Sequence, residues 1–169
     1  MNKNCLFFVL LISILAVSCQ KDDICPETAE TTPMLIIRFY DFEDQTKLKK
    51  AIGLNLIAEG QTDSLFTDAQ TTDSIAIPLK TFQNYTHYQF IVHIGEEPNT
   101  QLPTNADTLQ FSYFPEEEYL NKACGFKTEF LDFNALKVSE PNGENWIKNI
   151  IVEQTKIENE TGAHLSIFH

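Results

Sequence analysis

The chain has 169 residues, of which 12 are basic and 24 are acidic, so its formal net charge is −12 at pH 7. A surface this acidic argues against nucleic acid and against anionic lipid headgroups as partners, because like charges repel. The length suits a single domain, and a chain of this size buries enough surface on folding to be stable without a structural metal.

The first nineteen residues have the features of a secretory leader. Lys3 supplies a positive charge, and an apolar run follows from Cys5 to Ala16. That run is shorter than the roughly 20 residues that a membrane-spanning helix needs, and its length is typical of a signal peptide. The sequence Leu15-Ala16-Val17-Ser18-Cys19 resembles the lipobox of bacterial lipoproteins, although Ala16 stands where leucine is usual. We therefore expect residues 1–18 to be removed and Cys19 to be acylated; the alternative is ordinary secretion with Cys19 as a plain thiol.

Residues 19–32 are predicted to form a lipidated tether. No aspartate directly follows Cys19, which argues against retention at the inner membrane and favours the outer membrane. Lys21-Asp22-Asp23 resembles the surface-export signal of Bacteroidetes lipoproteins, but the same charges would also suit a soluble, disordered linker. The domain therefore faces either the cell surface or the periplasm.

Two cysteines remain once the leader and the lipid anchor are set aside. Cys25 and Cys124 would then share a compartment that permits disulfides, where they most simply pair with each other. The alternative is that they are two separate buried thiols.

The rest of the chain reads as a series of short strands from residue 33 onward. Leu35, Ile37 and Phe39 alternate in the first of them, and the cleanest alternation places Tyr88, Phe90, Val92 and Ile94 on one face. The same alternation is found in a later run, which contains Leu109, Phe111 and Tyr113. The predicted strands are Met34–Tyr40, 52–58, Ser64–Phe66, Ser74–Pro78, His87–Ile94, Asp107–Tyr113, 126–133, Trp146–Ile157 and Ala163–Phe168, with a helical turn at 115–122 and a tight turn at Pro141–Gly143.

This pattern predicts an all-β fold. Short strands separated by turns about every ten residues, with almost no helical periodicity, are typical of a sandwich. We expect an antiparallel two-sheet β-sandwich over residues 33–169, immunoglobulin-like in general style, with a small open barrel as the alternative.

No residues form a recognisable catalytic or metal-binding pattern. His87 and His93 share a strand face but lie six residues apart, roughly 20 Å along a strand, which is too far to bind one metal ion together. Both should be exposed sheet residues. Neither a nucleophile elbow nor a phosphate-binding glycine loop is present. We expect no catalytic residue, no metal ligands and no cofactor, and therefore a protein that is not an enzyme.

Two weaker signals concern carbohydrate. Trp146 lies beside the predicted Asn-Gly turn and could be an exposed stacking platform for a glycan, or a partly buried edge residue. Three tripeptides are similar to the O-glycosylation acceptor of Bacteroidetes envelope proteins, with Ser64, Ser74 and Thr108 as acceptors: Asp63-Ser64-Leu65, Asp73-Ser74-Ile75 and Asp107-Thr108-Leu109. The same residues are also common where a turn leads into a strand.

Four segments together resemble an uncharacterised family of Bacteroidetes lipoproteins, domain of unknown function 6452. They are CQKDDIC, LIIRFYD, ACGFKTEF around Cys124, and the terminal IENETGAHLSIFH. The resemblance covers nearly all of the chain after the leader. It implies the lineage, the lipoprotein address and a Cys25–Cys124 pair, and it implies no function.

Three functions follow as hypotheses. The first is a non-enzymatic module, anchored at the outer membrane through Cys19, that binds or supports another envelope protein such as an outer-membrane β-barrel. The second is a cell-surface carbohydrate-binding module that uses Trp146. The third is a hydrolase with no recognisable motif, built from residues far apart in the sequence.

Overall fold

A computed structural model describes residues 24–94, 104–139 and 145–169. The leader, Cys19 and the turn predicted at Pro141–Gly143 lie outside this part of the chain. The chain divides into two compact units. Residues up to Glu30 and Tyr119–Phe126 form the first, called here the hairpin-tip unit; Thr31–Glu118 and Lys127–His169 form the second, the sandwich unit.

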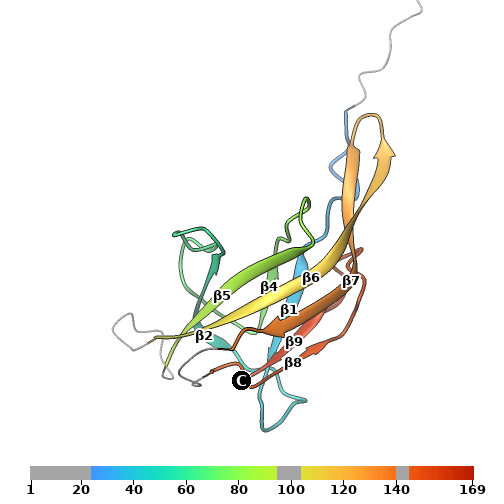
Figure 1. The fold of residues 1–169 in the computed structure, drawn as a ribbon. Helices are drawn as coiled ribbons and strands as arrows, with labels where there is room; N and C mark the ends of the chain where they lie inside the picture. The colour runs from blue at the N-terminus through green and yellow to red at the C-terminus, as the bar shows by residue number, and fades with distance from the viewer. Residues whose placement is uncertain (1–23, 95–103, 140–144) are drawn as a thin grey trace, which may run out of the picture. The chain divides into compact units, whose positions relative to one another are not determined.

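Nine strands and no helix are present in the described ranges, and the strands form two sheets (Figure 1). The four-stranded sheet has the order β4 (Ser74–Ile77), β1 (Leu35–Tyr40), β9 (Leu165–Phe168), β8 (Asn149–Val152). The five-stranded sheet has the order β3 (Gln70–Thr72), β2 (Ala51–Ala58), β5 (Tyr85–His93), β6 (Thr104–Asn121), β7 (Gly125–Lys137).

The pairing is antiparallel with one exception. Strand β5 pairs with β6 over nine residues, from Tyr85↔Ser112 to His93↔Thr104. Strand β1 pairs antiparallel with β4 but parallel with β9, in the register Ile37↔Leu165 to Tyr40↔Phe168. The predicted two-sheet β-sandwich is confirmed, with a single parallel pair at the centre of the smaller sheet.

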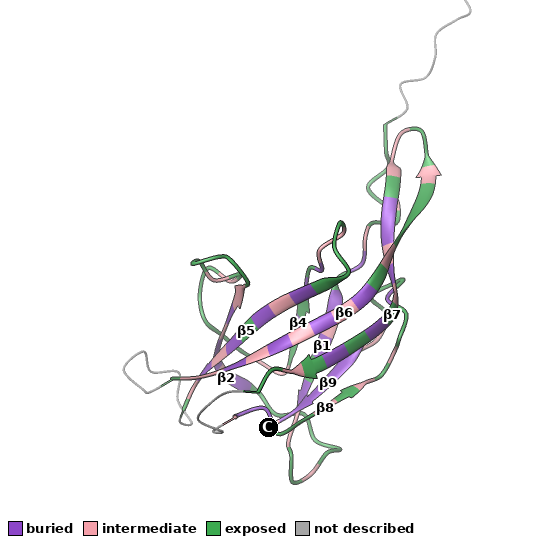
Figure 2. Cartoon of the chain, viewed as in Figure 1, coloured by how far each residue is buried: buried purple, intermediate pink, exposed green. Residues whose placement is uncertain are grey.

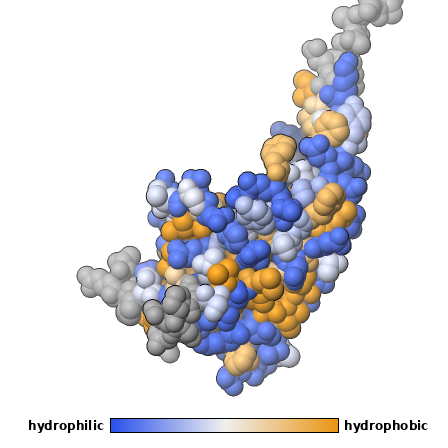
Figure 3. Space-filling model, in the orientation of Figure 1, coloured by the Kyte–Doolittle hydropathy of each residue, from blue (hydrophilic) through white to orange (hydrophobic). Residues whose placement is uncertain are grey.

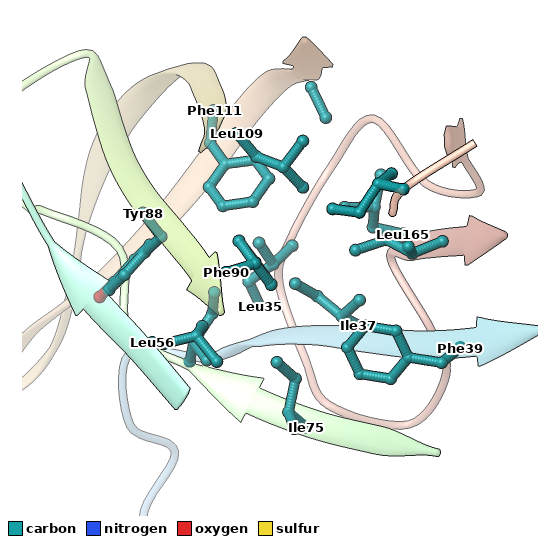
Figure 4. Packing of buried hydrophobic residues seen from close by; sticks show 14 of the residues in the cluster. Leu35, Ile37, Phe39, Leu56, Ile75, Tyr88, Phe90, Leu109, Phe111 and Leu165 are labelled. Carbon is teal, nitrogen blue, oxygen red and sulfur yellow. The ribbon is translucent and has the colours of Figure 1, made fainter. Parts of the chain in front are cut away.

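The core lies between the two sheets. Leu35, Ile37 and Phe39 of β1 are fully buried, as their alternation predicts. In Figure 4 they lie opposite residues of the larger sheet, among them Phe90 of β5. Phe90 packs edge-on against Phe111 of β6, with ring centroids 6.4 Å apart. The stripes of alternating burial along β5 and β6 in Figure 2 have the period of two that a strand with one buried face requires.

Three expectations about single elements are wrong, and one short strand was missed. Ser64–Phe66 forms no strand; Ser64 only bridges to Ile57. Residues 115–122 are not a helical turn, because β6 continues through them to Asn121. The long strand expected at Trp146–Ile157 shortens to β8, and the short β3 was not predicted.

Apolar side chains also remain on the outside of the sandwich. Figure 3 shows them gathered where β7, β8 and β9 are labelled in Figure 1. Leu136 of β7 and Ile151 of β8 are exposed there, and a groove of about 260 Å³ runs between these two strands, lined by Ala135, Ile147 and Ile150 among others. Each strand is the last in its sheet, so this is an open side of the sandwich.

Candidate functional site

The two remaining cysteines form a disulfide. Cys25 and Cys124 are bonded, with Cα atoms 4.8 Å apart and a separation of 99 positions in the sequence. The alternative of two separate buried thiols is therefore wrong. Both residues belong to the hairpin-tip unit.

The turn that carries Cys124 is stabilised by its own residues. The Asn121 side-chain oxygen accepts hydrogen bonds from the backbone amides of Ala123 and Cys124, each 2.9 Å long. Gly125 then has a φ of 73°, a left-handed conformation that glycine adopts without a steric penalty. The turn joins β6 to β7 and holds Cys124 at the end of the hairpin.

The three predicted glycosylation acceptors differ in their surroundings. Ser74 is exposed on β4, an edge strand. Ser64 is half-buried, and its hydroxyl donates to the Asn55 side chain and accepts from the Phe66 amide. Thr108 is half-buried inside β6, between β5 and β7, and does not lie at the start of a strand. Modification itself stays a prediction, and Ser74 is the acceptor with the most open position.

Trp146 is not an exposed platform. Its side chain is only 9% exposed, and its indole N–H donates to the Phe90 carbonyl, 3.0 Å away. The ring packs against Phe39 and His169, with centroids 6.3 and 5.4 Å away. The hydrogen bond of the indole N–H fixes the orientation of the ring. Because the ring is buried in this orientation, it offers no open face on which a sugar could stack.

Trp146 does contribute to the lining of a cleft of about 630 Å³ at one end of the sandwich. Five of the described residues that line the cleft have basic side chains and none of them has an acidic one; the basic residues are Lys49, Lys50, Lys148, His93 and His169. Two of the lysines already have partners, because Lys49 contacts Asp41 at 3.1 Å and Lys148 donates to the Asn145 carbonyl. The lysine ammonium groups are cationic donors for an anionic group, and no serine, threonine or cysteine is among the described residues that line the cleft.

His93 closes one side of this cleft by lying over Gly53. A Cβ atom at Gly53 would be 1.9 Å from His93 Cδ2, and Gly53 also has a φ of 58°. The His93 Nδ1 atom is buried without a hydrogen-bond partner. The predicted exposure of His93 is therefore only partly correct, since the ring is half-buried.

His87 lies at the surface, where it contacts the Glu59 carboxylate. Its Nδ1 lies 2.9 Å from the Glu59 carboxylate, and the hydrogen bond to that carboxylate raises the pKa of His87. No group of three metal-ligating side chains is found in the part of the chain that the structure describes.

A cluster of exposed aromatic residues is the most distinctive surface feature of the sandwich unit. Phe82 is 90% exposed and Phe114 is 61% exposed; with the half-exposed Tyr85 they line a depression of about 440 Å³. These three residues are called here the aromatic patch. The Lys80 ammonium lies 5.8 Å from the centre of the Tyr85 ring, a cation–π distance.

The turn that carries Phe82 is held from beneath by Tyr113. The Tyr113 hydroxyl donates to the Lys80 carbonyl at 2.9 Å, and its backbone amide donates to the Asn84 carbonyl at 3.0 Å. Thr86 adds a third support, because its hydroxyl contacts that of Tyr113 and accepts from the Lys80 amide. Phe82 is thus exposed on an ordered turn.

The patch was not predicted from the sequence, although one signal was present. Phe114 is out of step with Leu109, Phe111 and Tyr113, which alternate toward the core, so it must point to the opposite face. Phe82 belongs to no alternating run, and only the conformation of its turn exposes it.

No helix in the described part of the chain has the length and apolar character needed to cross a membrane. Comparison with curated proteins and with solved structures found no similar protein. A family model does match residues 53–169, which include most of β2, all later strands through β9, and the turn at Cys124. The chain therefore belongs to the family of unknown function DUF6452.

Proposed function

We propose that this chain is an outer-membrane lipoprotein of a Bacteroidetes envelope, anchored through acylated Cys19, and that it acts as a non-enzymatic module that binds another envelope protein. The disulfide supports a location outside the cytoplasm. A Cys25–Cys124 bond persists in oxidising compartments outside the cytoplasm, where a chain with this leader would be delivered.

The observation that carries the binding function is the aromatic patch. Leaving a phenylalanine such as Phe82 almost fully in water forgoes about 2 kcal/mol of burial energy. Exposed aromatic residues grouped in a depression are typical of surfaces that a partner covers. The rigid turn beneath Phe82 reduces the entropy that would be lost on binding.

The test is photo-crosslinking in intact cells. A photoreactive benzoylphenylalanine replaces Phe82 in one variant and Phe42 in a control; Phe42 is an exposed phenylalanine on the loop between β1 and β2. We expect a discrete crosslinked species from position 82, identified by mass spectrometry as an envelope protein, and none from position 42. Equal crosslinking from both positions, or none from position 82, would contradict the proposal.

The address is tested separately by the intact mass of the protein from membrane fractions. A mass that begins at acylated Cys19 and is two hydrogens light is expected. A mass without acyl groups would refute the lipid anchor. Protease treatment of whole cells then decides the face, since digestion indicates the cell surface and protection indicates the periplasm.

A further inference from the structure

We propose that the end of the β6–β7 hairpin, Tyr119–Phe126, lies on the lipid surface of the membrane in which Cys19 is anchored. This inference rests on the proposed lipid anchor. It adds a second, non-covalent membrane contact made by a defined element of the fold.

The first step is the covalent connection. Cys25 lies only six positions after Cys19, and six residues of chain span at most about 21 Å. Cys25 is bonded to Cys124, with a Cα separation of 4.8 Å. Without this bond, the first residue held by a contact with β7 would be Thr32, which lies thirteen positions after Cys19, a reach of about 45 Å. The disulfide therefore restricts the hairpin end to a short distance from the acyl chains.

The second step is the surface that the hairpin end presents. Tyr119 is 57% exposed and Phe126 is 63% exposed, and their rings contact each other edge to face at 5.2 Å. Ile24, next to the bonded Cys25, is also exposed. Tyrosine and phenylalanine are suited to the boundary between headgroups and acyl chains, where the ring is desolvated and a hydroxyl stays hydrated.

The third step is charge. Carboxylates stop at Glu118 and resume at Glu129, so the ten residues between them hold two lysines and no acid. The hairpin-tip unit also contains Glu27 and Glu30. A bilayer without net charge is therefore the expected surface, because it attracts the aromatic rings and does not repel these acids.

The fourth step is order. The Asn121 hydrogen bonds and the left-handed Gly125 fix the turn. A rigid turn on a short tether has a high effective concentration at the membrane, so even a small apolar contact is occupied for much of the time.

The experiment measures tryptophan fluorescence of the full protein, purified from membranes and reconstituted into phosphatidylcholine vesicles with brominated acyl chains, which quench nearby indoles. Phe126→Trp reports on the hairpin end. Leu48→Trp is the control, because Leu48 is a similarly exposed apolar residue of the sandwich unit. The native Trp146 is buried, so the unsubstituted protein gives the background.

We expect brominated lipid to quench the F126W signal at least twofold more than the L48W signal. We also expect Cys25→Ser with Cys124→Ser to bring the F126W quenching down to the L48W level. Equal quenching of F126W and L48W in acylated protein would overturn this inference alone, as would quenching that survives removal of the disulfide. A mass without acyl groups would overturn the lipid anchor and this inference together.

Discussion

Asp107 is a fully buried acidic residue, and its surroundings explain why an aspartate occupies this position in the Asp-Thr-Leu tripeptide. One carboxyl oxygen accepts from the Ile147 backbone amide at 2.7 Å and the other from the Asn145 side chain at 3.0 Å. The residue thus joins β6 to the segment that leads into β8. This fixes the segment that carries Trp146 and Lys148, two of the residues that line the cleft.

Replacing Asp107 with alanine should destabilise the protein by about 3 kcal/mol, because the buried Ile147 N–H loses its acceptor and a cavity remains. Asp107→Asn should cost less, since its side-chain oxygen can still accept from that amide. Thr108→Val is a matched control on the adjacent, half-buried position and should change stability little. Urea denaturation of the three variants measures these differences; equal stability of D107A and T108V would contradict this role.

His164 is the second buried residue that fixes a connection. Its Nδ1 accepts from the Ile36 amide, so its Nε2 carries the proton and donates to the Asn159 carbonyl; both distances are 2.9 Å. Burial lowers the pKa of His164 below its ordinary value of 6.5, and this effect outweighs the Asn159 hydrogen bond and the nearby Glu160, which act in the opposite direction. The neutral ring is therefore the form that the fold stabilises.

The pH dependence of stability follows from that shift. Because the folded-state pKa of His164 lies below the unfolded value, the unfolded chain takes up the proton first as the pH falls. The contribution is fully present above about pH 6.5 and is lost as the pH decreases toward the folded-state pKa. His164→Gln should be less stable at pH 7.5 and should lose less stability between pH 7.5 and 5 than the wild type. Parallel pH profiles from chemical denaturation would show that the effect belongs to other groups.

At the scale of elements, alternation of apolar residues predicted the strands that have one face in the core. Strands β1, β5 and the first half of β6 lie where the alternating runs around Leu35, Phe90 and Phe111 predicted them. The alternation has a period of two because every second side chain of such a strand is buried in the core. Ile94 was expected to continue the β5 stripe but is exposed, since β5 ends at His93.

The elements that were predicted wrongly are those whose state depends on distant residues. Proline followed by three glutamates favours the start of a helix, but residues 115–121 belong to β6, which is the neighbour of β7 in the sheet. The nearly buried Lys127 of β7 lies 3.0 Å from both Glu118 and Glu129, and Glu129 in turn pairs with Lys156 at 2.9 Å. This network links residues up to 38 positions apart, and no local pattern in the sequence contains it.

Of the features described as candidate sites, only the disulfide could be predicted from the sequence. The disulfide followed from the number of cysteines and the family resemblance, which do not depend on packing. The sequence left open whether Trp146 is an exposed platform or a partly buried residue, because a single aromatic residue beside a turn gives no alternation from which to read its direction. The cleft and the aromatic patch combine residues from several strands, so only the folded chain brings them together.

At the scale of the whole molecule, the disulfide joins two parts of the hairpin-tip unit, while the sandwich unit has its own core. Closing a loop of about 100 residues would stabilise a protein by nearly 5 kcal/mol if the free ends were otherwise unconstrained. Here the folded state already restricts Cys25, because Thr32, seven residues later, accepts a hydrogen bond from the Thr128 amide at 2.9 Å.

The stabilisation should therefore reflect the difference between closing a loop of 99 residues in the unfolded chain and one of about seven in the folded protein, which is about 2 kcal/mol. We expect the C25S/C124S variant to stay folded and to lose about this much in guanidinium denaturation. Wild-type protein treated with a reductant should match it. A loss of 4 kcal/mol or more would contradict the estimate, because it would mean that the Thr32 contact does not restrict the segment once the bond is gone.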